Sequence, residues 1–155
     1  MTSRQTKRTA NPAASLQLGE QLCFALYSAM LAMNKVYRKL LVELGVTYPQ
    51  YLVLLVLWER DGLMVSEIGD RLFLESPTLT PLLKRMELLG LLRRIRGKND
   101  ERQVIVSLTG QGRALRDRAK VVPGGVLCAA GCSPKELASI RDQLFQLRAG
   151  LLENS

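Results

Sequence analysis

Hydrophobic residues recur at helical spacing along most of the chain, starting with a long N-terminal stretch. The apolar stripe between Leu18 and Leu44 predicts a helix of about 27 residues, which begins near Ser15 and ends at Gly45. A helix of that length spans roughly 40 Å, more than a compact domain of this size needs internally. We therefore expect part of this helix to contact something outside its own domain.

Two further helices are predicted by their capping residues. Thr47 and Gln50 have the spacing of a capping box, and the helix that follows to about Arg60 is apolar on nearly every side, as a core helix is. Near the other end of the chain, Ser133 to Glu136 is a second capping box. The apolar residues that follow it form a narrow stripe typical of paired helices: Leu137, Ile140, Leu144, Leu147 and Leu151.

The central stretch from about residue 62 to 108 has a different order of elements. Ser66 is predicted to cap a short helix, and a longer helix follows that Gly90 ends. Pro77 and Pro81 cannot both stand at the first helical position, which leaves the start of this second helix open.

Two short runs with β-branched residues come next, at Leu92–Arg96 and Arg102–Leu108. The polar residues between them, Gly97 to Glu101, predict the tip of a hairpin. Two helices followed by a hairpin is the order of a winged helix-turn-helix, which lays its second helix in the DNA major groove and its hairpin beside the backbone. The expected fold class is mainly α with a small β wing.

The charge of the chain agrees with that fold. Its net charge is +8, which favours an anionic partner. Basic residues gather in the hairpin, and a solvated hairpin tip is the ordinary alternative. Beside a helix pair with polar positions, however, the cluster favours double-stranded operator DNA. The candidate DNA-binding residues are Ser76, Thr78, Thr80, Lys84, Arg85, Arg94, Arg96, Lys98 and Arg102.

The region after the hairpin returns to helical spacing. Thr109 is predicted to cap a helix that Pro123-Gly124-Gly125 then kinks or breaks, leaving a small apolar segment at residues 126–132. Together with the overlong first helix, the narrow C-terminal stripe predicts a homodimer built from residues 15–45 and 109–153, although packing within one subunit is the alternative. Two recognition helices would then face half-sites about one DNA turn apart.

The composition excludes several other chemistries. The chain has no histidine, which removes the commonest general base and the usual mixed zinc sites. Cys128 and Cys132 have loose metal-ligand spacing but no second pair, so we expect neither an enzyme, a metal site nor a cofactor. The longest apolar run, Tyr51–Trp58, is far shorter than the roughly 20 residues that cross a bilayer. We expect a cytoplasmic protein without membrane contact, with a single domain at 15–155 behind a disordered basic arm at 1–14.

Cys23 lies in the predicted first helix. A buried cysteine that acts as a small hydrophobe is the ordinary interpretation. Tyr27 lies one turn further on the same face, however, and Tyr37 and Tyr48 follow, and a tyrosine hydroxyl can donate a hydrogen bond to a thiolate. Tyr37 lies roughly 21 Å further along the axis than Cys23, so the two cannot touch within one helix. If they meet, the partner subunit must supply the tyrosine.

Two segments of the central stretch carry a resemblance to a known family. They are LTPLLKRMELLGLLRR and NDERQVIVSLT, and the second contains a D-x-R wing signature at Asp100 and Arg102. Both resemble the MarR family of bacterial transcription regulators, in which an ion pair at this signature would hold the hairpin. A further pattern is similar to the organic hydroperoxide resistance regulators (OhrR type) of that family: Cys23, Tyr27, Tyr37 and Tyr48. The resemblance covers roughly residues 18–155.

The resemblance implies a homodimeric repressor whose inducer is an organic hydroperoxide. Cys23 would be the sensing thiol, oxidised to a sulfenic acid, and Tyr37 and Tyr48 would reach it from the other subunit. Cys128 would mark the two-cysteine subtype, in which an intersubunit disulfide releases the DNA. Cys132 is a weaker candidate for that role.

Two other functions stay open on the sequence. One is a MarR-like regulator that responds to a small phenolic ligand, with Cys23 merely buried. The other is a thiol peroxidase, against which stand the absence of a C-x-x-C motif and the basic winged core. Stoichiometric loss of one thiol with an alkyl hydroperoxide favours the sensor over the ligand-binding regulator, whereas multiple turnover with a reducing system favours the peroxidase.

Overall fold

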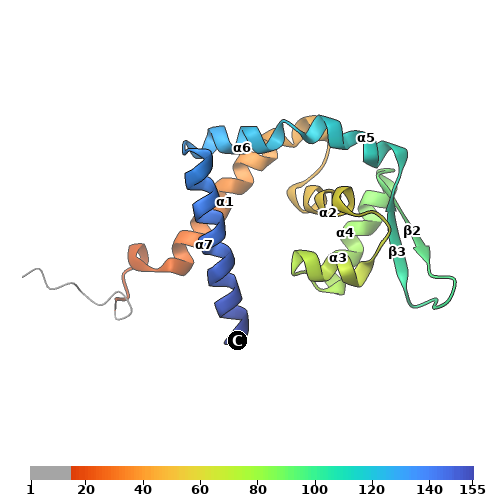
Figure 1. Ribbon diagram of the computed structural model, residues 1–155, viewed down its shortest axis with the longest axis horizontal. Helices are drawn as coiled ribbons and strands as arrows, with labels where there is room; N and C mark the ends of the chain where they lie inside the picture. The colour runs from red at the N-terminus through yellow and green to blue at the C-terminus, as the bar shows by residue number, and fades with distance from the viewer. Residues whose placement is uncertain (1–14) are drawn as a thin grey trace, which may run out of the picture. The chain divides into compact units, whose positions relative to one another are not determined.

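The computed structural model describes residues 15–155, so the basic arm predicted at residues 1–14 lies outside the described residues (Figure 1). The chain divides into two compact units, Met1–Lys35 and Val36–Ser155. The elements in chain order are a 3-10 turn at Leu18–Glu20, α1 (Leu22–Leu40), a second 3-10 turn at Val42–Leu44, α2 (Tyr48–Glu59), β1 (Leu63–Met64), α3 (Val65–Leu72), α4 (Ser76–Leu88), β2 (Leu92–Arg96), β3 (Val104–Leu108), α5 (Gly110–Ala119), α6 (Val122–Ala130) and α7 (Pro134–Glu153).

The first helix is shorter than the sequence predicted. A helix of about 27 residues was expected, but α1 has 19, because 3-10 turns replace α-helix at both of its ends. Gln21 interrupts the helix at its start with an extended backbone, ψ 122°, and its side-chain amide donates to the Ser15 carbonyl. Apolar residues recur every three or four positions in both kinds of helix, so the hydrophobic stripe alone does not reveal these breaks.

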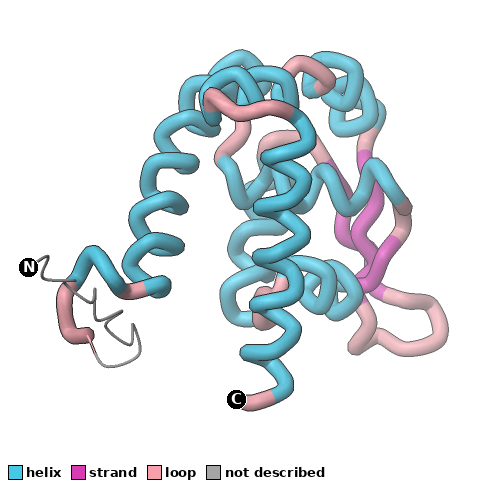
Figure 2. Tube along the Cα trace, turned by 60° about the vertical axis from the view of Figure 1, so that its left-hand side comes forward, coloured by secondary structure: helices cyan, strands magenta, loops and turns pink. Residues whose placement is uncertain are grey.

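A three-stranded antiparallel sheet forms the wing, with the strand order β1-β3-β2 (Figure 2). The β2–β3 hairpin was predicted, and its register pairs Leu92 with Leu108 and Arg96 with Val104. The strand β1 was not predicted, because two residues are too few to show an alternation of apolar and polar positions. With a mainly helical chain, this sheet confirms the predicted fold class.

The helix pair beside the sheet also differs from the sequence prediction in one detail. The residue Ser66 does not cap α3, because the helix already begins at Val65. The Glu67 carboxylate instead accepts a hydrogen bond from the Met64 backbone N–H, at 2.8 Å. The next helix, α4, begins at Ser76 with one proline in its first turn and the other, Pro81, inside the helix.

The predicted ends of two other helices are confirmed. Gly90 follows α4 with φ 74°, a left-handed conformation that glycine adopts without steric cost. The capping box of α2 is complete, with the Gln50 side chain accepting from the Thr47 N–H at 3.0 Å. The capping box at Ser133 is likewise complete at the start of α7.

The core lies between the sheet and the helices α2, α3 and α4. Side chains with no exposed surface come from each part of it: Val53, Leu54, Ile68, Leu79, Leu83, Met86 and Val106. By contrast, neither α1 nor α7 contains a buried residue. The Arg148 guanidinium of α7 lies 4.5 Å from the ring centre of Phe73, at the end of α3, and 4.7 Å from that of Phe145.

The segment around Cys128 is regular helix, which corrects the predicted kink. Pro123 stands in the first turn of α6 rather than breaking a longer helix, because its missing N–H has no helical partner there. The helix then continues to Ala130 and ends at Gly131, with φ 65°. Within residues 15–155, no helix combines the length and the hydropathy that a membrane span requires.

Candidate functional site: a DNA-binding surface and a thiol–tyrosine set

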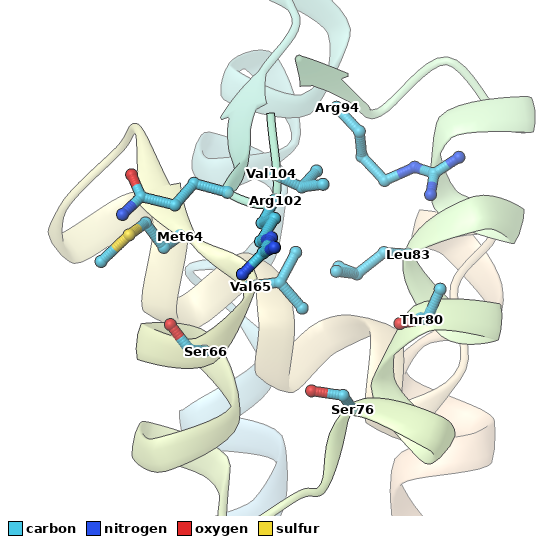
Figure 3. A pocket seen from close by; sticks show the side chains of 10 residues that line it. Met64, Val65, Ser66, Ser76, Thr80, Leu83, Arg94, Arg102 and Val104 are labelled. Carbon is cyan, nitrogen blue, oxygen red and sulfur yellow. The ribbon is translucent and has the colours of Figure 1, made fainter. Parts of the chain in front are cut away.

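The polar residues predicted to contact DNA lie along α4. Four of them are exposed, namely Ser76, Thr78, Lys84 and Arg85. Thr80 is half-buried and lines a cavity of about 300 Å³ between the helix pair and the wing (Figure 3). The first turn of α4 thus offers hydroxyl groups to solvent, as a helix that reads DNA base edges must.

Two arginines of the wing border this cavity but are oriented differently. The Arg102 side chain, from the end of the hairpin, lies in the middle of the cavity in Figure 3, whereas the Arg94 guanidinium turns toward α4. Arg96, Lys98 and Arg102 are exposed. These three basic side chains are therefore free to approach a phosphate backbone.

Arg94 makes a structural ion pair, which the sequence did not predict. Its Nη2 atom lies 2.8 Å from the Glu87 carboxylate, and its backbone N–H donates to the same carboxylate at 3.0 Å. These hydrogen bonds, first the backbone one and then those of the guanidinium, hold the pKa of Glu87 below its usual value. Seven residues and a turn separate the partners, so helical spacing gives no signal for the pair. The structure assigns Arg94 to joining α4 and β2.

The predicted ion pair between Asp100 and Arg102 is replaced by a backbone contact. The Asp100 carboxylate accepts a hydrogen bond from the Arg102 N–H at 3.0 Å, and the described residues contain no ion pair between the two side chains. An aspartate that caps the next backbone N–H is the usual way to hold a tight turn. The signature therefore shapes the hairpin tip and leaves the Arg102 side chain free.

Asp61 fixes the base of the wing, another role that the sequence did not predict. Its carboxylate accepts hydrogen bonds from the backbone N–H groups of Gly62 and Leu108, at 2.9 and 2.8 Å, and from Arg113, at 2.8 Å. Burial alone would raise the pKa of Asp61, but these three donors outweigh it and the pKa is lowered. Asp61 thus connects the end of α2 to β3 and α5.

The three cysteines occupy different positions. Cys23 is exposed in the first turn of α1, where free backbone N–H groups favour an anion, and Tyr27 is exposed one turn further on. Cys128 is exposed near the end of α6, and Cys132 is half-buried after it. The exposure of Cys23 argues against a merely buried hydrophobic cysteine.

Tyr37 and Tyr48 pack directly against one another. Their ring centres lie 4.5 Å apart, and Tyr51 joins them with its ring centre 5.9 Å from that of Tyr37. Burial, followed by the neighbouring phenol groups of Tyr48 and Tyr51, raises the pKa of Tyr37 to about 12. Burial likewise raises the pKa of Tyr48. All of these hydroxyls remain protonated donors at neutral pH.

The similarity of this chain to known proteins agrees with that geometry. The transcriptional regulator SarA/Rot family matches residues 35–119, more than half of the chain. The chain is 52% identical over 143 residues to the HTH-type transcriptional regulator TtmR of Methylorubrum extorquens, covering 88% of this chain and 73% of TtmR. It is 46% identical over 132 residues to the organic hydroperoxide resistance transcriptional regulator of Bacillus subtilis, covering 85% of this chain and 90% of that protein.

A solved structure extends the similarity to a DNA complex. Reduced AbfR bound to DNA is 38% identical to this chain with a TM-score of 0.70, over 88% of this chain and 96% of that one. AbfR, from Staphylococcus epidermidis, has also been solved with a disulfide formed. Both curated relatives are named as transcriptional regulators. The chain therefore belongs to the MarR family of winged-helix, DNA-binding transcriptional regulators, in its SarA/Rot-type branch.

Proposed function

We propose that this protein is a homodimeric repressor that senses organic hydroperoxides through Cys23 and releases its operator DNA when Cys23 is oxidised. The observation that carries the proposal is the packed pair of Tyr37 and Tyr48. Their hydroxyls make no hydrogen bond within residues 15–155, so both are available to a thiolate. The chain is also 46% identical to a regulator named for organic hydroperoxide resistance.

The apolar surface of the terminal helices supports a homodimer. Large apolar side chains of α1 and α7 are exposed in the single chain: Leu22, Tyr27, Met30, Leu31, Ile140, Leu144, Phe145, Leu151 and Leu152. Contiguous exposed apolar surface on this scale marks an interaction site. An antiparallel contact between two copies of α1 would bring Cys23 of one protomer to Tyr37 of its partner.

The proposed chemistry requires only the hydroperoxide and two thiols. The Cys23 thiolate attacks the terminal oxygen of the hydroperoxide, the O–O bond breaks, and the organic oxygen leaves as an alkoxide that takes up a proton. Cys23 then carries a sulfenic acid. The Cys128 thiol of the partner subunit attacks the Cys23 sulfur, the oxygen leaves as water, and an intersubunit disulfide remains.

The disulfide would couple this chemistry to DNA binding by changing the dimer. A disulfide requires Cα atoms within about 7 Å, so the segments that carry Cys23 and Cys128 must approach to that distance. Because α6 is regular helix, the movement displaces the whole helix rather than a loose segment. The two copies of α4 would then lose the spacing that matches successive major grooves.

The experiment compares three cysteine variants with the wild type on operator DNA. Addition of one equivalent of cumene hydroperoxide should release wild-type protein and give a covalent dimer on a non-reducing gel. Cys23→Ser should bind DNA and ignore the peroxide. Cys128→Ser should still lose the Cys23 thiol but give no covalent dimer, and Cys132→Ser should behave as the wild type.

Each variant can contradict a separate part of the proposal. If Cys23→Ser still responds to the peroxide, Cys23 is not the sensor. A covalent dimer that persists in Cys128→Ser and disappears in Cys132→Ser would transfer the resolving role to Cys132. Repeated turnover of peroxide with a thiol reductant would favour a thiol peroxidase.

A further inference from the structure

A third tyrosine belongs to the aromatic cluster that holds Tyr37 and Tyr48. Tyr51 lies one turn after Tyr48 on α2 and is only 4% exposed. Its ring is tilted by 41° to that of Tyr37, at a centre-to-centre distance of 5.9 Å. Tyr37 therefore packs over two tyrosines of α2 rather than one.

The other side of Tyr51 is held by a fixed tryptophan. The Tyr51 and Trp58 rings meet edge to face, with their centres 6.4 Å apart. The Trp58 indole N–H donates to the Gly112 carbonyl of α5 at 2.9 Å, which fixes the orientation of that ring. The position of Tyr51 is thus determined from both sides, so its hydroxyl has a defined place beside Tyr37.

The three hydroxyls influence one another and have unused hydrogen-bonding capacity. The phenol groups of Tyr48 and Tyr51 both add to the raised pKa of Tyr37, after burial, and Tyr48 does the same for Tyr51. This mutual effect requires the oxygen ends of the side chains to be near each other. None of the three makes a hydrogen bond within residues 15–155, and none is a fully enclosed unpaired group.

We propose that Tyr51 is a positioning residue of the thiol-sensing site, and that its hydroxyl orients the hydroxyls of Tyr37 and Tyr48 toward the thiolate. This inference rests on the proposed function. A phenol both donates and accepts one hydrogen bond, so two phenols alone can donate to each other instead of to the sulfur. A third donor behind them satisfies their acceptor sites, and each bond in such a chain strengthens the next.

The proposed step leaves the redox chemistry unchanged. The Tyr51 proton stays on its oxygen throughout, and the hydrogen bond passes to the phenol oxygen of Tyr37 or Tyr48. The protons of those two groups then point at the Cys23 sulfur of the partner subunit. Tyr51 acts through its neighbours and touches neither the thiolate nor the peroxide.

The test removes only the hydroxyl. Tyr51→Phe should keep the ring contacts, the melting temperature and the DNA affinity of the reduced protein. Its rate of thiol oxidation by cumene hydroperoxide should fall by about three- to tenfold, the scale of one net hydrogen bond. The ultraviolet absorbance of the thiolate at neutral pH should fall in parallel, which a purely structural role for the ring would not cause.

Trp58→Phe provides the matched control, because it keeps an aromatic ring beside Tyr51 and leaves all three hydroxyls in place. It should lose stability but retain most of the oxidation rate. If Tyr51→Phe oxidises at the wild-type rate while Cys23→Ser abolishes the response, Tyr51 has no positioning role and the sensor assignment stands. If Cys23→Ser still responds, the proposed function itself has failed.

Discussion

The winged core and the two terminal helices use their apolar residues in opposite ways. In the core, side chains such as Ile68, Leu79 and Leu83 have no exposed surface at all. In α1 and α7 no residue is buried, and Leu22 and Leu151 are 58% and 61% exposed. The core is thus complete within one chain, whereas the terminal helices have the composition of an interface without its partner.

This difference separates DNA binding from sensing. The residues predicted to contact DNA lie on elements that the core holds in place, namely α4 and the hairpin. Cys23 and Cys128 are exposed on helices outside that core. A change in how two protomers meet can therefore move the DNA-binding elements as rigid bodies without unfolding them.

The largest expected effect comes from removing one apolar side chain from each region. Leu83→Ala leaves a cavity in a packed core and should lower the free energy of unfolding by about 2–5 kcal/mol. Leu144→Ala, on the exposed stripe of α7, should instead weaken the dimer. Urea unfolding measures the first effect, and sedimentation equilibrium at several concentrations measures the second. Equal losses of stability that do not depend on concentration would remove the distinction between the regions.

A smaller effect is expected from filling a close approach inside the core. A Cβ atom at Gly112 would lie 2.0 Å from the Leu91 carbonyl oxygen, so α5 must shift in Gly112→Ala. We expect a loss of about 1–3 kcal/mol, the range for overpacking. Gly110→Ala, two residues earlier in the same helix, meets nothing within 4 Å and serves as the control. Thermal unfolding of the two variants tests the difference, and similar melting temperatures would contradict it.

The two basic side chains Arg94 and Lys98 should separate structural from DNA-contacting roles within the wing. Arg94→Ala breaks the bond with Glu87 and should lower stability by about 1 kcal/mol, limited by the partial exposure of the pair. Lys98→Ala should leave stability unchanged but weaken DNA binding and flatten its dependence on salt. Unfolding curves and binding at several salt concentrations provide the measurements. An Arg94→Ala protein of full stability with a flattened salt dependence would restore Arg94 to the DNA contacts.

The smallest effect concerns acid sensitivity at the base of the wing. The pKa of Asp61 is lower in the folded protein than in the unfolded chain, so its contribution to stability is present above the unfolded value, about 4, and is lost as the pH falls through the folded value. Asp61→Asn should therefore be less stable than the wild type at neutral pH, and the difference should shrink in acid. Arg113→Ala removes one of three donors and should show an intermediate effect. A difference that stays constant with pH would argue against this role.

Much of the core could be predicted from the sequence because its signals are local. The capping boxes at Thr47 and Ser133, the glycine that ends α4 and the hairpin all depend on residues within a few positions of each other, and all are confirmed. The resemblance to the MarR family is confirmed as well.

The missed features depend on contacts between residues far apart in the chain. Asp61 bonds to Leu108 and Arg113, and Trp58 bonds to Gly112, across about fifty residues in each case. Nothing in hydrophobic periodicity signals such contacts. The same limit explains why Arg94 was predicted as a DNA contact, since its charge is visible in the sequence but its partner Glu87 is not.

The most direct test of the central claim is a mixed dimer in which the two halves of the sensing site lie on different chains. One protomer carries Cys23→Ser, and the other carries Tyr37→Phe and Tyr48→Phe. If the tyrosines act across the interface, this dimer contains one intact site, and its single Cys23 should react with cumene hydroperoxide at the wild-type rate. If Cys23 reacts as slowly as in the homodimer with both tyrosines replaced, the site is not shared between protomers and the proposed sensor is wrong.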